Sequence, residues 1–221
     1  MRTSATIGPP ATIDRPAARD ATSIAARLRG RRAALRVIRA ARALVDEGLV
    51  VGTVGNVSAR VGDRLVITPT RRDYATLRPR DLAIVDLTSG RTLRGTPSRE
   101  LPLHRAVYAH RPDVQAVVHT HSVAATAWSF LGAPLEPELE DLAYHGIGSI
   151  RTSAPAPAGS DALATAVRTA LGDSGAVLLG EHGVLGVGPD VDRALVAARV
   201  VEHQARVAWL LRDGRDPADR T

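Results

Sequence analysis

The sequence predicts an α/β domain of the α+β type, with a central mixed, largely antiparallel sheet covered by helices. Two observations predict this fold class: apolar residues recur at helical spacing in several segments, and short apolar runs bounded by turn residues lie between those segments. The chain has 221 residues, of which 44% are hydrophobic. This is enough to bury one substantial core, so we expect a single domain over residues 23–212.

The N-terminal part divides into a leader, a helix and three strands. Residues 1–22 are rich in Pro, Ala, Thr and Arg without periodicity, and we expect a disordered leader. From Ser23 apolar residues recur at helical spacing, which predicts an amphipathic helix ending near Gly48. The segments NVSAR, RLVITP and LAIVDL are expected to be short strands that pair antiparallel.

The rest of the chain alternates between helices and strands. We expect ELPLHRAVYAHRP to be a helix that Pro112 ends, followed by a strand, VQAVVHTH, and a helix, SVAATAWSFLG. Residues 133–158 are expected to form a loop, because they are rich in Pro and Gly. A helix, DALATAVRTALG, two strands, GAVLLG and VLGVG, and a final helix over 191–211 follow, and residues 213–221 are expected to be a frayed tail.

Two residue types are missing, and each absence excludes chemistry. The chain has no cysteine, so thiolate metal sites, disulfides and cysteine nucleophiles are excluded. It has no lysine either, because all 29 basic residues are arginine, and this excludes enzymes that form a Schiff base through a lysine. A transition-metal site would therefore have to be built from histidine and carboxylate.

Charge and hydropathy narrow the set of partners. Ten of the arginines lie in residues 1–42 with only two acids, and the remaining 179 residues carry 19 arginines and 21 acids. Because no aromatic side chains interleave with the basic segment, we expect a solvated helix face and no nucleic-acid partner. No apolar run is long enough to span a membrane and no secretory signal is evident, so we expect a cytoplasmic protein.

Two histidines, His119 and His121, lie two residues apart at the end of an apolar run. Residues i and i+2 of a strand point to the same side, so both imidazoles would face one volume. His182 in GEHGVLGVG offers a third imidazole, and Gly183 would permit a tight turn there. Three histidines with one open position are typical of a catalytic divalent metal, whereas a lone H-x-H is more often a pair of surface or core histidines.

Three stretches taken together resemble the class II aldolase/adducin family. They are GNVSARVGDRLVITPT, SRELPLHRAVYAHRPDVQAVVHTH and LLGEHGVLGVG, in that order, and the resemblance covers residues 25–210. It implies that His119, His121 and His182 hold a divalent metal, zinc in the first place, with Fe²⁺, Mn²⁺ or Co²⁺ as alternatives. It also implies that Glu100 is the catalytic acid/base or a further metal contact, and that the protein is a homotetramer with active sites between subunits.

The resemblance further implies a pocket for a small anionic substrate. The family holds a phosphate with residues that match Gly55, Asn56, Thr70 and Ser98. Here Arg71 and Arg99 stand where the family has a glycine and a serine. Two guanidinium groups would bind a phosphate or carboxylate in bidentate fashion, or fill the pocket and exclude the usual sugar phosphate, or point to solvent.

Three other side chains have two interpretations each. The family supplies a tyrosine across a subunit boundary, and Tyr144 or His145 would take that role here or simply pack a loop. His104 follows Glu100 by one helical turn and would either form a hydrogen bond with it or be a satisfied helix histidine.

These observations predict a divalent-metal-dependent lyase that acts on an anionic sugar or hydroxy-keto acid. Retro-aldol cleavage, or decarboxylation through the same enediolate, would require Glu100 to move a proton, and we expect its pKa to be raised toward neutrality by burial. Two alternatives remain open: an Fe(II)-dependent oxygenase on the same scaffold, and a non-catalytic module like that of adducin.

Overall fold

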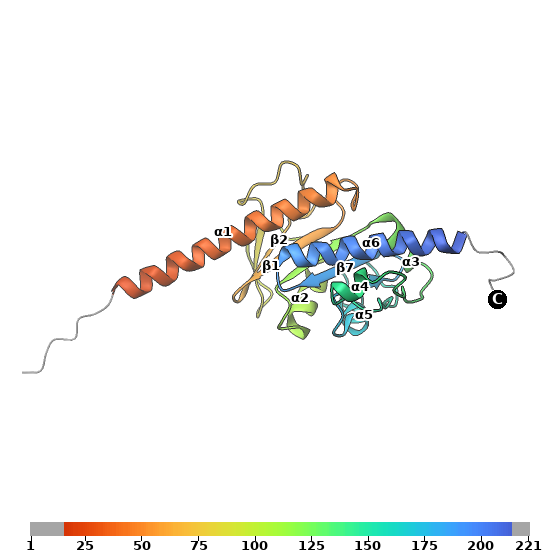
Figure 1. The fold of residues 1–221 in the computed structure, drawn as a ribbon. Coiled ribbons are helices and arrows are strands. Elements are labelled where there is room, and N and C mark those ends of the chain that lie inside the picture. The colour runs from red at the N-terminus through yellow and green to blue at the C-terminus, as the bar shows by residue number, and fades with distance from the viewer. Residues whose placement is uncertain (1–15, 214–221) are drawn as a thin grey trace, which may run out of the picture.

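One seven-stranded sheet forms the centre of the protein, with the strand order β4-β3-β2-β1-β5-β7-β6 and every neighbouring pair antiparallel (Figure 1). The computed structural model describes residues 16–213, and side chains over 26–212. The strands are β1 (Asn56–Val61), β2 (Arg64–Ile67), β3 (Ala83–Asp86), β4 (Thr92–Arg94), β5 (Ala116–Thr120), β6 (Ala176–Leu179) and β7 (Gly183–Gly188). The predicted fold class, a largely antiparallel sheet covered by helices, is confirmed.

Helices cover both faces of this sheet. Helices α1 and α6 pack on one face, while α2 and α5 pack against each other and cover the other face. Helix α3 packs on α6 beside β6 and β7 and closes a third apolar cluster. The helices are α1 (Pro16–Asp46), α2 (Leu101–His110), α3 (Val123–Ser129), α4 (Asp141–Tyr144), α5 (Asp161–Leu171) and α6 (Val191–Asp213).

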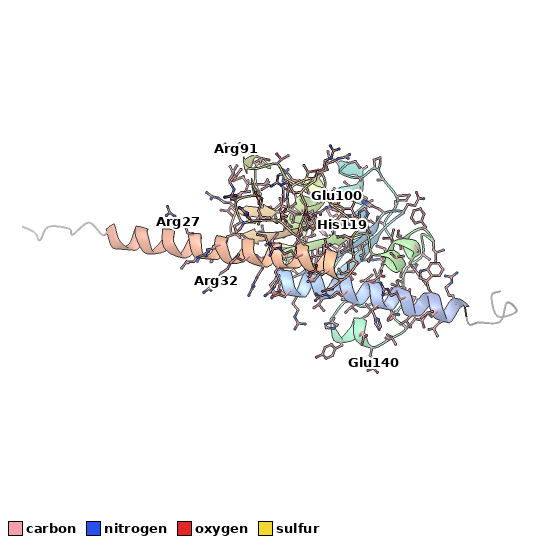
Figure 2. All side chains as sticks on the ribbon, turned by 90° about the horizontal axis from the view of Figure 1, so that it is seen from above. Arg27, Arg32, Arg91, Glu100, His119 and Glu140 are labelled. Carbon is pink, nitrogen blue, oxygen red and sulfur yellow. The ribbon has the colours of Figure 1, made fainter. Side chains whose placement is uncertain are left out.

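The ends of the chain differ from the sequence-based boundaries. Helix α1 begins at Pro16, so residues 16–22 of the predicted leader are helical, and the rest of that leader lies outside the described residues. Only the C-terminal half of α1 packs on the sheet, and the N-terminal half projects from the body, as Figure 2 shows at Arg27 and Arg32. Residues 214–221 of the predicted tail are also outside the described part.

Two short elements were not predicted. Strand β4 consists of three exposed residues at the sheet edge, so it has no apolar pattern from which it could be recognised. Helix α4 is a single turn within the predicted loop 133–158, and it begins in an acidic stretch rather than an apolar one. None of the helices in the described part of the chain is long and apolar enough to cross a membrane.

The pleat of β5 decides which of its side chains meet α2 and α5. Val118 points into the apolar cluster under α1, and Val117 points into the cluster under α2 and α5. Because side chains alternate along a strand, His119 shares the face of Val117. In the antiparallel register Asn56 of β1 lies directly opposite His119. The sheet therefore places polar side chains from two strands together beneath α2.

The turn that leads into β1 depends on Gly55. Its φ of +75° lies in the left-handed region, and a Cβ built there would lie 2.7 Å from the carbonyl oxygen of His119 and 2.6 Å from Val50 Cγ1. The buried Tyr74 hydroxyl donates a 2.6 Å hydrogen bond to the Gly55 carbonyl. The backbone of this turn is thus pressed against the strand that carries the histidines.

Replacement of Gly55 by alanine should destabilise the protein more than the same change at Gly62. Gly62 also has a positive φ, +59°, but no atom lies within 4 Å of its missing Cβ, so Gly62→Ala carries only the backbone cost, about 1 kcal/mol. Gly55→Ala adds a clash with backbone and should cost at least about 2 kcal/mol more. Urea unfolding of both variants measures the difference. Equal losses in the free energy of unfolding would show that the backbone around Gly55 shifts to accommodate the added Cβ at little energetic cost.

Candidate active site

The three predicted histidines converge at one end of the sheet. His119 and His121 come from the end of β5 on the same face, and His182 precedes β7, which pairs with β5. The ring centroids form a nearly equilateral triangle with sides of 4.8, 4.9 and 4.9 Å. One ligand nitrogen from each ring lies within 4.8 Å of the others. The structure thus brings together residues that are 63 positions apart in the sequence.

The backbone around His182 differs from the prediction that Gly183 makes the turn. The positive φ belongs to Glu181, at +57°, while Gly183 is the first residue of β7. A Cβ on Gly183 would instead collide with the carbonyl oxygen of Thr120. Gly183 is therefore required by the close approach of β7 to β5, and Glu181 holds the strained conformation next to the site.

Hydrogen bonding decides which nitrogen of His119 faces the other rings. Its Nδ1 lies 2.9 Å from the carbonyl oxygen of Val184, and a carbonyl can only accept, so Nδ1 carries the proton. In the neutral ring the lone pair is then on Nε2, which lies 3.0 Å from Nε2 of His121. Histidines that bind a metal usually donate their other ring N–H to a carbonyl or carboxylate in this way, which fixes the tautomer.

The environment keeps the other two rings neutral. Burial lowers the pKa of His121 to about 4, and the nearby His119 and His182 lower it further than Glu100 raises it. The pKa of His182 is also lowered, first by burial and then by His119. Neutral imidazole is the form that binds a cation, so the donor set suits a divalent metal.

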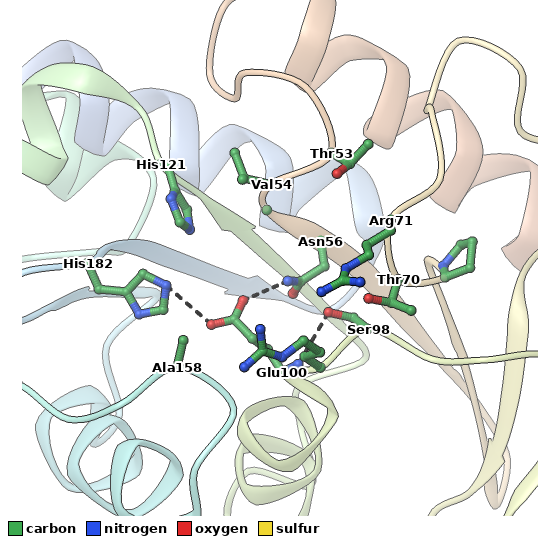
Figure 3. Close-up of a pocket in the computed structure, with 13 residues that line it drawn as sticks. Thr53, Val54, Asn56, Thr70, Arg71, Ser98, Glu100, His121, Ala158 and His182 are labelled. Atoms are coloured by element: carbon green, nitrogen blue, oxygen red, sulfur yellow. Dashed lines mark hydrogen bonds and ion pairs between the residues drawn. The ribbon is translucent and has the colours of Figure 1, made fainter.

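Glu100 lies against these rings and completes the donor set. Its Oε2 is 3.1 Å from Nε2 of His119 and accepts a 2.7 Å hydrogen bond from Nδ2 of Asn56, and its Oε1 is 3.3 Å from Nε2 of His182 (Figure 3). Oε1 is buried and has no aligned hydrogen-bond partner in the described part of the chain. A buried carboxylate oxygen without such a partner, facing neutral imidazoles, is where a cation would fit.

The prediction of a raised pKa for Glu100 is wrong. Burial does raise it, but the electrostatic interaction with His119, the Asn56 hydrogen bond and the interaction with His182 outweigh burial and lower the pKa to about 2. The side chain is therefore a carboxylate at neutral pH. It can accept a proton or coordinate a cation in this state.

A cleft of about 270 Å³ opens above Glu100, His121 and His182. All the predicted anion-binding residues line it, and His119 lies buried beneath it. In Figure 3 the side chain of Arg71 extends over Asn56 toward the carboxylate. The residues of this group are Gly55, Asn56, Thr70, Arg71, Ser98 and Arg99.

Two of these residues have local features that bear on their roles. Arg71 has a φ of +53°, so this arginine holds a conformation that favours glycine. Asn56 is buried, and its amide forms hydrogen bonds with Glu100 and His104 through its two polar atoms. No ion pair involving Arg71 or Arg99 is found among the described residues, which leaves two positive charges at the cleft.

The predicted tyrosine substitute lies elsewhere. Tyr144 is 84% exposed on α4, packs its ring against His145, and lines a separate cavity of about 530 Å³ beside β7 and α6. It does not line the cleft of its own chain. A role for Tyr144 or His145 in a neighbouring subunit stays a prediction.

Several residues of the site were missed from the sequence. Thr53 and Val54 line the cleft from the loop before β1, and Ala158 lines it from the proline-rich segment, but none of the three has a chemical signature. Ser58 lies beneath the site and contacts His104, and Tyr108 contacts Ser58. The side chain of His104 contacts Asn56 and not the Glu100 carboxylate. The spacing of Ser58 from Asn56 on the strand was the available signal.

Comparisons with known proteins point to one family. The family model described as Class II Aldolase and Adducin N-terminal domain matches residues 35–209. An L-fuculose phosphate aldolase from Methanococcus maripaludis is 38% identical over 171 residues, covering 76% of this chain and 91% of the relative. A 5-methylthioribulose-1-phosphate/5-deoxyribulose-1-phosphate aldolase from Rhodospirillum rubrum is 38% identical over 182 residues, covering 81% and 82%. A solved L-fuculose 1-phosphate aldolase superposes with a TM-score of 0.79 at 28% identity, covering 84% and 88%.

Removal of any one of the three imidazoles should abolish tight metal binding. His119→Ala, His121→Ala and His182→Ala should each weaken Zn²⁺ binding by at least about 100-fold, because each leaves only two imidazole ligands. Isothermal titration with zinc measures this on protein first treated with a chelator. His203→Ala, an exposed histidine on α6, is the matched control and should bind as the wild type does. Unchanged affinity in the three variants would place the metal elsewhere.

Proposed function

The chain belongs to the class II aldolase and adducin family, and we propose that it is a divalent-metal-dependent aldolase that cleaves a small anionic sugar by a retro-aldol reaction. The observation that carries this proposal is the convergence of three imidazoles and one carboxylate at the floor of a cleft with two unpaired arginines. The names of the relatives support it, because they are aldolases of phosphorylated sugars. Cytoplasmic location is part of the same proposal.

His119, His121 and His182 would hold the metal, and zinc is the ion that we propose. Three imidazoles without any thiolate suit zinc and also Fe²⁺, Mn²⁺ or Co²⁺, so ligand type alone does not decide among them. When bound, such an ion polarises a substrate carbonyl and stabilises negative charge on the oxygen. The buried hydrogen bond from His119 to Val184 keeps one ligand ring in the required tautomer.

Glu100 would transfer the proton at the carbon next to the substrate carbonyl. Its carboxylate is ionised, partly buried from bulk water, and aimed into the cleft by Asn56. In the direction of aldol addition, a carboxylate in this position takes a proton from that carbon. In cleavage it gives that carbon a proton, which balances the proton lost by the substrate hydroxyl as it becomes the aldehyde.

The substrate anion would lie toward the opposite end of the cleft from His182. Thr70 and Ser98 offer hydroxyl groups there. Arg71 and Arg99 offer guanidinium groups that have no ion-pair partner among the described residues. Arginine binds phosphate and carboxylate in bidentate fashion, so a sugar phosphate and a sugar carboxylate both fit this end of the cleft. The substrate hydroxyl loses its proton as it becomes the leaving aldehyde, and Tyr144 or His145 of a second copy would take up that proton, which requires the homotetramer implied by the family.

The two alternatives are not favoured. The relatives named above are aldolases, which gives no support to an iron-dependent oxygenase. A non-catalytic module would not need three imidazoles that converge beside a buried carboxylate, one of them held by a hydrogen bond to the Val184 carbonyl. Decarboxylation through the same enediolate would use the same residues. The released product distinguishes the two reactions, because decarboxylation gives carbon dioxide and cleavage gives an aldehyde.

Glu100→Gln tests the proposed function. Zinc-loaded wild type should release an aldehyde from at least one member of a panel of ketose 1-phosphates and the corresponding sugar acids. The variant should lose at least about 100-fold in kcat, because the amide cannot carry the proton. Glu47→Gln, which removes a surface ion pair with Arg199, is the control and should keep the wild-type rate. Full turnover by Glu100→Gln would refute the role of Glu100, and carbon dioxide without aldehyde would refute cleavage.

Arg71→Gly should stabilise the fold while weakening substrate binding. Glycine relieves the positive φ, which raises the free energy of unfolding by about 0.5–1 kcal/mol, and loss of the guanidinium should raise KM about 10-fold. The neighbouring Arg72→Gly is the control, because Arg72 pairs with Asp81 and does not line the cleft. It should lower stability and leave KM unchanged. An unchanged KM in Arg71→Gly would show that Arg71 points to solvent.

A further inference from the structure

We propose that His104 is a positioning residue, which fixes the orientation of the Glu100 carboxylate through Asn56. This inference rests on the proposed function, in which Glu100 transfers the proton. His104 itself does not line the cleft and has no exposed surface. Its effect on the reaction would therefore pass through the side chain of Asn56, which lies between His104 and Glu100.

Helix α2 and strand β1 face each other with a row of polar side chains on each. Glu100, His104 and Tyr108 follow at intervals of four residues along one face of the helix, and Asn56 and Ser58 share one face of the strand. Nδ2 of Asn56 is 2.7 Å from Oε2 of Glu100, and Oδ1 of Asn56 contacts Nε2 of His104. Side chains from the helix and the strand alternate, so that five polar groups form one continuous series of contacts.

The direction of each hydrogen bond follows from the Asn56 amide. Its NH₂ donates to Glu100 Oε2, and its carbonyl oxygen faces His104. That carbonyl only accepts, so Nε2 of His104 must carry the proton. Nδ1 of the neutral ring is then an acceptor. A half-turn of the Asn56 amide would set two acceptors against each other at Glu100 and two donors against each other at His104.

Ser58 and Tyr108 fix the tautomer of His104. Nδ1 lies 2.7 Å from the hydroxyl of Ser58, which must donate to it, and that hydroxyl lies 2.8 Å from the Tyr108 hydroxyl, which donates in turn. Burial lowers the pKa of His104 to about 3 and raises the pKa of Tyr108, so both side chains are neutral. Every member of the chain from Tyr108 to Glu100 is buried, and water does not compete for these bonds.

The arrangement holds one carboxylate oxygen in place and leaves the other open. Oε2 is held by Asn56 beside His119, whereas Oε1 faces His182 without an aligned hydrogen bond. Without the contact from His104, Asn56 could rotate and the carboxylate would lose its only side-chain hydrogen bond among the described residues. A displacement of about 1 Å at a reacting group costs up to about 100-fold in rate.

A double-mutant cycle tests whether His104 acts through Asn56. His104→Met and Asn56→Ala should each lower kcat about 10- to 100-fold in the zinc-loaded enzyme, with KM changed less than about twofold. The double variant should be no slower than Asn56→Ala, because both changes remove the same contact. His104→Gln, whose amide can donate to Asn56, should recover most of the rate. His110→Met, an exposed histidine at the end of the same helix, is the control and should keep the wild-type kcat.

A second measurement does not depend on turnover. ¹⁵N NMR of histidine-labelled protein should show His104, assigned from the spectrum of His104→Gln, as the neutral tautomer with the proton on Nε2. The opposite tautomer, or an imidazolium at neutral pH, would overturn the proposal, as would additive effects in the cycle or full activity in His104→Met. If His104→Met fails to fold, the kcat of His104→Gln and the tautomer of His104 in the wild type decide whether the proposal holds. An inactive wild type with the predicted tautomer would refute the aldolase function and leave the hydrogen-bonded chain standing.

Discussion

The antiparallel pairing of β1, β5 and β7 is the constraint on which the site depends. The register sets Asn56 opposite His119 and brings the start of β7, preceded by His182, beside the end of β5. Alternation along β5 then turns His119 and His121 to the face that α2 covers. A slip of one residue in β5 would exchange these imidazoles with Val118 and Thr120 and remove the site.

Burial of so many polar groups beneath α2 is tolerated because nearly all of them have partners. An unpaired buried polar group costs about 1–3 kcal/mol, so the Tyr108–Ser58–His104–Asn56 chain is stable only when every donor meets an acceptor. The exception is Oε1 of Glu100, which faces the imidazoles. The two described non-glycine residues with positive φ, Arg71 and Glu181, both border the same region. Both strained residues and this unpaired oxygen thus border the place where a ligand would be bound.

Sequence patterns were sufficient where local periodicity determines structure. The i, i+2 spacing of His119 and His121 and the helical pattern after Glu100 predicted the face and the element of each residue. They did not predict what His104 contacts, because Asn56 and Ser58 lie 48 and 46 positions away and only the β1–α2 packing brings them together. The pKa of Glu100 was missed for the same reason: burial is evident from the pattern, whereas the opposing effect of His119 and His182 appears only in three dimensions.

The central claim is that His119, His121 and His182 hold one divalent cation with a coordination position left for substrate. X-ray absorption at the zinc edge of the reconstituted protein tests this most directly. The account predicts three imidazole nitrogens at about 2.0–2.1 Å and an oxygen that a substrate analogue exchanges. A spectrum with fewer than three imidazoles, or a closed site that no ligand enters, would contradict it.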